Sequence, residues 1–555
     1  MKRLVLLLFL FCLYDTALAY DKYWVEFTDK NGTPYSTGNP SAFLSSRSIQ
    51  RRQNQGIPVT QRDLPVNPSY VQQVLATGAV NLRYTSRWFN AMSIQTTDTN
   101  ALNAIAALPF VSSVQAVMRY YQPDDSFEEF YESLDANKSS PQGGFILQPL
   151  AYNYGPSFNQ INMIGGDCMH NMGYHGEGMV IAVLDAGFYQ VDILPAFDSL
   201  RTNGQILGTW DFVAGNASVY EDNAHGEMVL SCMGGYLDGQ LVGTAPKAKY
   251  WLFRTEDAGT EYLVEEDNWV AAAEFADSVG ADIINTSLGY TTFDDAGMNH
   301  TYNDMDGNTC RISICQDYAA AVGMFPVCSA GNSGSSSWFY IGAPADADSV
   351  LAVGAVDATG TLASFSSRGP SSDGRVKPNV CAQGVNAIVA APSGGTQTAN
   401  GTSFSSPITC GAVACLWQAN PTFSIGQLFN AIQMSATQFS SPDSLYGYGI
   451  PNFCLANVIL NGGSLDNFQD DHLMNTWPNP FNEEFSFTFY STRNQTLVIE
   501  MYDVTGRMVL SDSREVKENS ITNYKAVNLS TLATGMYFLK ITTPTGKYTV
   551  KMMKG

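Results

Sequence analysis

Short, unbroken apolar runs alternate with longer alanine-rich stretches in the middle of this chain, and no other feature constrains its fold as strongly. The apolar runs lie at residues 179–184, 281–284, 325–328 and 350–353. Alanine-rich stretches lie between them, notably at residues 268–279 and 408–418. Strands buried on both faces have such runs, and strand–helix alternation favours a parallel sheet covered by helices on both faces. Residues 154–461 are therefore predicted to form an α/β domain with its site at the carboxyl ends of the strands.

The regions on either side differ in pattern from the middle. Residues 20–123 mix strand-like and helix-like segments, including a basic helix expected over residues 41–55, and predict a small α+β domain. Residues 477–555 carry short alternating segments separated by Thr-Gly turns, which predict an all-β sandwich. Residues 124–153 and 462–476 show little periodicity and are expected to be linkers, the first of them a processing region.

The first residues of the chain have the pattern of a signal peptide. Lys2 and Arg3 precede an apolar run over residues 4–13, and Ala17-Leu18-Ala19 places small residues at a cleavage position. Residues 1–19 are therefore expected to be removed. The apolar run is far shorter than the ~20 residues that span a bilayer, which argues against a membrane anchor.

Charge and cysteine content exclude several classes of function. The 29 Lys and Arg residues against 51 Asp and Glu give a net charge of −22, which opposes binding to nucleic acid or to an anionic membrane. Ten cysteines are present, one of them within the expected signal, so an odd number remains and cannot all pair within one chain. Cys310 and Cys315 flank a short loop and are the best candidates for a local disulfide. Cys232, Cys410 and Cys415 lie in apolar stretches typical of buried thiols.

Three residues at element boundaries have the chemistry of a nucleophile, a base and an orienting acid. Ser403 precedes a long apolar helix candidate, where the helix dipole favours a developing negative charge. His225 opens H-G-E-M-V-L-S-C-M-G-G, a stretch whose small residues permit close helix packing. Asp185 ends the first apolar run, where a carboxylate is costly unless it has partners. Together the three types support nucleophilic catalysis, although Ser403 taken alone is better explained as a helix N-cap.

The segments around these residues resemble the active-site blocks of the subtilisin-like serine proteases. Asp185 lies in V-L-D-A-G, His225 in H-G-E-M-V and Ser403 in N-G-T-S-F-S-S-P, in the order that this family uses. Two further blocks between them are similar to the family, I-I-N-T-S-L-G and C-S-A-G-N-S-G. The resemblance covers about residues 155–459. It implies a subtilisin-like fold and a serine endopeptidase that forms an acyl-enzyme and requires no cofactor for its chemistry.

The resemblance also implies roles for single residues. Asp185, His225 and Ser403 would form the catalytic triad, and Asn332 would donate to the oxyanion. Two segments would pair with the substrate backbone, and Gly342 would form the floor of a pocket for a large apolar or aromatic residue. The substrate-binding residues implied in this way are Ser287, Leu288, Gly289, Ser329, Ala330, Gly331 and Gly342.

Some positions depart from the family pattern, and alternatives stay open. Ala186 stands where Ser or Thr is usual, and Glu227-Met228 stand where a Thr-His pair is usual, but neither position supplies a triad group. A catalytically silent surface or binding protein on the same fold is the alternative function. An α/β-hydrolase esterase is disfavoured, because Ser403 lacks a G-x-S-x-G motif and the triad order differs. Residues 304–308 partly match a calcium loop, so a structural calcium ion is an alternative to a plain turn there.

The flanking regions have resemblances of their own. Residues 20–123 resemble an inhibitory propeptide, and the basic segment at residues 44–57 is similar to propeptides of subtilases from Bacteroidetes-type bacteria. Residues 477–555 resemble the C-terminal sorting domain of the type IX secretion system, through P-N-P-F, Y-D-V-T-G-R and L-A-T-G-M-Y. These resemblances imply a zymogen with three kinds of partner: peptide or protein substrates, its own propeptide, and the type IX secretion and sorting machinery. They imply export through the periplasm to the medium or the cell surface.

Overall fold

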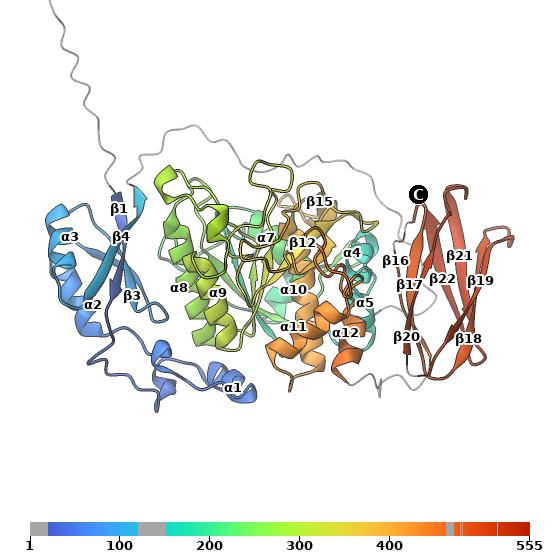
Figure 1. Cartoon of the computed structure of the whole chain (residues 1–555), viewed down its shortest axis with the longest axis horizontal. Coiled ribbons are helices and arrows are strands. Elements are labelled where there is room, and N and C mark those ends of the chain that lie inside the picture. Colours follow the sequence, from blue (N-terminus) through green and yellow to red (C-terminus); the bar gives the residue numbers. More distant parts are fainter. Residues whose placement is uncertain (1–19, 120–150, 462–470, 478, 480, 519) are drawn as a thin grey trace, which may run out of the picture.

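The computed structural model describes residues 20–119, 151–461, 471–477, 479, 481–518 and 520–555, which form three units in a row (Figure 1). The expected signal peptide, most of the first linker and residues 462–470 lie outside the described residues. The domain boundaries stay predictions. Within the described part of the chain, no helix is long and apolar enough to cross a membrane.

The N-terminal unit is a four-stranded antiparallel sheet in the order β2-β3-β1-β4. Its strands are β1 (Tyr20–Phe27), β2 (Asn81–Ser86), β3 (Ala91–Gln95) and β4 (Val111–Arg119). Helices α2 (Pro68–Leu75) and α3 (Thr99–Ala106) pack on one face of it. Side chains alternate along β1, so Val25 joins this core while Trp24 points to the other face and contacts the middle unit. The predicted α+β domain is confirmed. The basic helix is present but shorter than expected, as α1 (Ser46–Asn54).

The middle unit contains the predicted parallel sheet, with seven strands in the order β13-β12-β11-β10-β5-β9-β6. The strands are β5 (Val180–Asp185), β6 (Ile206–Asp211), β9 (Lys249–Arg254), β10 (Ile283–Thr286), β11 (Phe325–Ser329), β12 (Leu351–Val356) and β13 (Val380–Gln383). The helices that matter for the site are α7 (His225–Gly234), α8 (Leu263–Val279), α9 (Arg311–Ala321) and α10 (Thr402–Ala419).

Helices cover both faces of this sheet, as the unbroken apolar runs predict. Along β5, Ile181 and Val183 share one core with residues of α7 and α10. The alternate residues Ala182 and Leu184 share a second core with α8 and α9. The N-terminal sheet packs on the outer side of this second core, to which it contributes Trp24 and other residues.

The C-terminal unit is the predicted all-β sandwich. One sheet has the order β16-β17-β20 and the other the order β19-β18-β21-β22, both antiparallel. The strands are β16 (His472–Trp477), β17 (Phe485–Ser491), β18 (Gln495–Asp503), β19 (Met508–Val516), β20 (Ser520–Ala526), β21 (Gly535–Thr542) and β22 (Lys547–Lys554). Phe487 of one sheet and Ile499 and Leu539 of the other are buried in a shared core.

The cysteines only partly follow the prediction. Cys310 and Cys315 are buried and free, so the expected disulfide between them is wrong. Cys310 precedes α9 while Cys315 lies inside it, and five residues along a helix separate the directions of the two side chains by about 140° around the axis.

The observed disulfide joins Cys168 of α5 (Gly166–Asn171) to Cys454 of α12 (Phe453–Leu460). Tyr490 of the C-terminal unit packs against it. The three other cysteines expected to be buried thiols, Cys232, Cys410 and Cys415, are confirmed as such.

Helix α7 buries a carboxylate that has no partner. Glu227 is 0% exposed, and neither carboxylate oxygen has a hydrogen-bond partner among the described residues. Burial raises the pKa of Glu227 to about 8. The side chain is therefore protonated at neutral pH, because ionisation would leave an uncompensated charge in the core.

Replacing Glu227 by glutamine should stabilise the protein at neutral and alkaline pH. A glutamic acid in the unfolded chain loses its proton near pH 4.5, whereas folded Glu227 keeps its proton until about pH 8. The unfolded state therefore binds fewer protons between these values, and the parent loses stability as the pH rises through the window. We expect the melting temperature of the parent to fall relative to that of Glu227→Gln from about pH 5 to about pH 8, measured by calorimetry. The exposed Glu221→Gln is the control, and an equal pH dependence in parent and Glu227→Gln would contradict the prediction.

Candidate active site

Three parallel strands end side by side and carry the expected site residues. Leu184 of β5 lies opposite Thr286 of β10, which lies opposite Cys328 of β11. Asp185 is the last residue of β5. The segment 287–289 follows β10, and the segment 329–331 begins at the last residue of β11. Parallel pairing thus brings residues far apart in the sequence to one edge of the sheet.

His225 and Asp185 are in direct contact at this edge. His225 is the first residue of α7, and its Nδ1 lies 2.6 Å from Oδ1 of the fully buried Asp185. A Cβ on Gly226 would lie 2.9 Å from Cβ of Asp185, so the glycine lets α7 approach β5 closely. The backbone N–H of Ala186 donates to the same Oδ1 at 2.8 Å. Oδ2 of Asp185 has no partner among the described residues, and Ala186 has no hydroxyl to donate to it.

The electrostatic environment favours a charged His225. Burial by itself lowers the pKa of the imidazole. The carboxylates of Asp185 and Glu256 outweigh burial and raise the pKa of His225 above its usual value. The ring is thus ready to hold a proton while an opposite charge lies beside it.

Ser403 lies in the first turn of α10 and contacts the segment that follows β10, while its neighbour Phe404 lies near the imidazole. Its Oγ donates to the carbonyl of Ser287 at 3.4 Å, and Ser287 Oγ donates to the carbonyl of Ser403 at 3.0 Å. The rings of His225 and Phe404 lie 6.1 Å apart between centroids. The three residues that the sequence singled out as nucleophile, base and acid therefore come from three separate elements, α10, α7 and β5, of which the structure shows the last two in direct contact.

Asn332 borders the same space as the start of α10. Its Oδ1 accepts hydrogen bonds from both N and Oγ1 of Thr402, each at 2.9 Å. A Cβ on Gly401 would lie 3.6 Å from Asn332 Nδ2 and 3.6 Å from the backbone N of Ser403. Asn332 Nδ2 and the backbone N of Ser403 therefore both lie beside the position that a side chain at residue 401 would occupy.

The seven residues expected to bind substrate gather beside these groups. Ser329 Oγ donates to the carbonyl of Leu288 at 3.5 Å, so the segments that follow β10 and β11 are adjacent. Tyr290 and Ala343 exchange backbone hydrogen bonds of 2.8 and 3.2 Å, which places Gly342 next to the end of the first segment.

An acidic cluster that the sequence analysis did not single out lies nearby. One carboxylate oxygen each of Glu256, Glu261 and Glu265 lie within 4.8 Å of one another, and among the described residues this is the group that could hold a metal ion. Burial raises the pKa of all three, that of Glu256 to about 7, and repulsion from neighbouring carboxylates adds to the effect. The acid-rich stretch 256–266 was the available signal. At the loop 304–308, by contrast, Asp304 accepts a hydrogen bond from the backbone N–H of Thr301, and Asp306 accepts from those of Asn308 and Thr309.

Comparison with known proteins gives a family match for each of the three units of the chain. Residues 176–449 match the subtilase family, residues 22–129 a peptidase S8 propeptide domain of Bacteroidota, and residues 475–555 a secretion system C-terminal sorting domain. Subtilisin DY of Bacillus licheniformis is 32% identical over 53% of this chain and 95% of its own length. Subtilisin E of Bacillus subtilis is 29% identical over 57% of this chain and 75% of its own length. Bacillopeptidase F of Bacillus subtilis is 31% identical over 52% of this chain, but only 21% of its own length is matched.

The family matches, the parallel sheet and the residues gathered at its edge agree with one another. The chain belongs to the subtilase family: it is a secreted serine endopeptidase with an N-terminal propeptide domain and a C-terminal secretion sorting domain.

Proposed function

We propose that the mature enzyme cleaves peptide bonds through a triad of Asp185, His225 and Ser403. The 2.6 Å contact between His225 Nδ1 and Asp185 Oδ1, at the edge of the sheet beside which Ser403 lies in the first turn of α10, carries this proposal. Asp185 holds the proton of Nδ1, which leaves Nε2 with a lone pair that can accept a proton.

The reaction then proceeds in two halves. Ser403 Oγ attacks the carbonyl carbon of the substrate while His225 Nε2 takes the hydroxyl proton. His225 returns that proton to the leaving amine as the C–N bond breaks, and the acyl group stays on Ser403. Water adds to the acyl-enzyme by the same proton transfers and releases the acid product.

Asn332 and the Ser403 backbone N–H would stabilise the tetrahedral oxyanion. Thr402 occupies Oδ1 of Asn332 as an acceptor, so Nδ2 is the group left to donate. Both donors border the position that Gly401 leaves open. Donors fixed in advance around a developing charge lower the barrier without reorganisation.

Substrate recognition would follow from the segments around the triad. Residues 287–289 and 329–331 would pair with the substrate backbone as neighbouring strands. Gly342 would leave a deep pocket for a large apolar or aromatic residue before the scissile bond.

The flanking domains would control when and where the enzyme acts. The propeptide would inhibit the peptidase until it is removed, and the C-terminal domain would direct export by the type IX machinery to the medium or the cell surface.

Replacing Ser403 by alanine should abolish activity without unfolding the chain. We expect kcat to fall by about 10⁶, the loss known for the subtilisin nucleophile, together with all labelling by a fluorophosphonate probe. The exposed Ser393→Ala is the control and should keep both. Labelling that persists in Ser403→Ala would refute the triad. A parent that folds but neither labels nor cleaves would favour the silent binding protein.

Replacing Asn332 by aspartate should separate its two roles. Aspartate keeps an acceptor for Thr402 but cannot donate to the oxyanion and adds a repelling charge. We expect Asn332→Asp and Asn332→Ala each to lower kcat by at least about 10²–10³, the loss known for the oxyanion-hole amide of subtilisin, with little change in KM. An Asn332→Asp enzyme that retains full kcat would show that the side chain only holds Thr402. The exposed Asn303→Ala is the control.

Deleting residues 477–555 should block export but not catalysis. The sandwich has its own core and touches the peptidase domain through contacts such as Tyr490 on the Cys168–Cys454 disulfide, whereas the proposed triad lies at the strand ends. We expect active enzyme to accumulate in the periplasm, measured by peptidase assay of cell fractions beside the intact chain. Normal levels of the truncated enzyme in the medium would mean that this domain has another role.

A further inference from the structure

The propeptide contacts the peptidase domain at a place far from the catalytic edge of the sheet. Helix α8 ends shortly before β10 begins, so the carboxyl end of the helix lies beside the amino ends of the strands. Ser403 lies at the opposite edge of the sheet, where the strands have their carboxyl ends. Helix α1 of the propeptide lies at this end of α8 and α9 (Figure 1). The contact therefore does not involve the active-site cleft.

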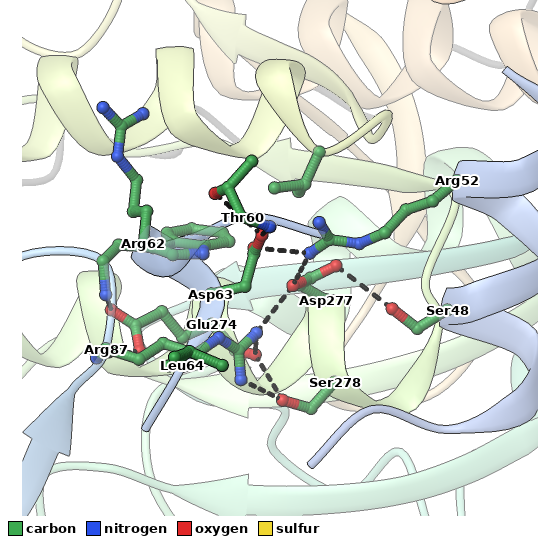
Figure 2. A network of polar contacts seen from close by, with 12 residues as sticks. Ser48, Arg52, Thr60, Arg62, Asp63, Leu64, Arg87, Glu274, Asp277 and Ser278 are labelled. Atoms are coloured by element: carbon green, nitrogen blue, oxygen red, sulfur yellow. Dashed lines mark hydrogen bonds and ion pairs between the residues drawn. The ribbon is translucent and has the colours of Figure 1, made fainter. Parts of the chain in front are cut away.

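One buried carboxylate forms the centre of this contact. Asp277 Oδ2 accepts hydrogen bonds from Arg52 Nη2 at 2.7 Å and Arg87 Nη2 at 2.6 Å (Figure 2). Its Oδ1 accepts from Arg51 and from Ser48 Oγ. The Asp277 side chain is 0% exposed, and those of Arg51 and Arg52 are 3% and 2% exposed. Three propeptide arginines therefore meet at one carboxylate, away from water.

Other carboxylates balance the charge of these arginines. Arg52 also pairs with Asp63 of the propeptide at 2.9 Å. On the peptidase domain, Glu274 accepts hydrogen bonds from the backbone N–H groups of Arg87 and Trp88 at 2.8 and 3.1 Å. A buried ion network of this kind is strongly destabilised when one partner is removed, because the remaining charge stays buried.

Propeptide arginines also donate to backbone carbonyls near the carboxyl ends of α8 and α9. The last carbonyls of a helix have no intrahelical donor and carry partial negative charge, and the last turns of α8 and α9 contain no basic residue. At α8, Arg87 Nη2 donates to the carbonyl of Glu274, which lies before the last turn, and Arg47 Nε donates to that of Gly280, which follows the last residue of the helix, both at 2.8 Å. At the end of α9, Arg51 donates to the carbonyl of Val322 at 3.3 Å.

We propose that Asp277, together with the carboxyl ends of α8 and α9, is an arginine-binding site that anchors the propeptide independently of the active-site cleft. The site keeps the propeptide on the enzyme after the chain has been cut between the two domains. This regulatory role rests on the proposed zymogen function. The site selects arginine because a guanidinium donates to a carboxylate and to helix-end carbonyls at the same time.

The anchor stays charged through the neutral and mildly acidic range. Burial alone would raise the pKa of Asp277, but the guanidinium groups of Arg51, Arg87 and Arg52 outweigh it and hold the pKa below its usual value. The contribution of Asp277 to binding is therefore present above the ordinary aspartate pKa and is lost only as the pH falls through the lowered one. Protonation of Asp277 therefore does not release the propeptide near neutral pH.

The test uses the full chain with two changes. Ser403→Ala prevents the chain from cutting itself, and a recognition site for a sequence-specific protease is inserted within residues 124–144. After cleavage, the rate at which labelled propeptide leaves the rest of the chain is followed by size-exclusion chromatography. We expect the parent to remain a complex. Asp277→Asn should increase the rate of propeptide release by roughly 100- to 1,000-fold, the order expected when a buried ion pair is broken. The double variant Arg51→Gln, Arg52→Gln should do the same from the propeptide side, which covers the case in which Asp277→Asn does not fold.

Two controls separate the anchor from general charge effects. Asp238→Asn removes an exposed carboxylate of the peptidase domain and should change nothing. Arg119→Gln breaks another ion pair across the interface, with Asp295 at 2.8 Å, but this arginine side chain is 35% exposed, so we expect less than about a tenfold change.

Combining Asp277→Asn with the double arginine variant should reduce the binding free energy of the propeptide by less than the sum of the separate losses. The proposal is overturned if the parent releases its propeptide at once on cleavage, or if Asp277→Asn retains it as long as Asp238→Asn does. Because binding is measured without catalysis, failure of the triad would leave this result interpretable.

Discussion

Parallel pairing of β5 with β10 and of β10 with β11 fixes three strand ends at one edge of the sheet, and the candidate active site depends on that alignment. Asp185 ends β5, and the segments expected to hold substrate follow β10 and β11. In a parallel ladder a shift of one register step would move all of these residues relative to His225 and Ser403, which come from helices on the face of the sheet. The cores on both faces prevent such a shift, because the side chains of β5 are buried alternately in one and the other.

Buried charge is the second organising feature, and it occurs at both edges of the sheet. At the carboxyl edge, one carboxylate oxygen of Asp185 is paired with His225 and with the backbone N–H of Ala186. At the amino edge, Asp277 is satisfied almost entirely by the propeptide. The first arrangement is complete within the peptidase domain, whereas the second exists only while the propeptide is present. The same physical rule, that a buried carboxylate needs partners, thus applies to the proposed triad at one edge and to the proposed propeptide anchor at the other.

Much of the fold could be predicted because its signals are local. Unbroken apolar runs predicted β5, β10, β11 and β12, and Thr-Gly turns marked the sandwich. The strand β9 (K-Y-W-L-F-R) was missed because charged ends interrupt its apolar pattern. The disulfide was assigned to the wrong pair because spacing along the chain favoured Cys310 and Cys315. Cys168 and Cys454 are separated by 286 positions and approach only through the packing of α5 and α12.

The sequence by itself singled out Asp185, His225 and Ser403 as the proposed triad, since they lie in motifs that can be recognised one at a time. It also determined that residues 44–57 are basic. Only the tertiary structure decided what Arg51 and Arg52 bind, because their partner Asp277 belongs to an alanine-rich helix more than two hundred positions away. The physical reason is that a motif records local chemistry, whereas a buried ion pair is created by desolvation, which depends on segments that meet only after folding.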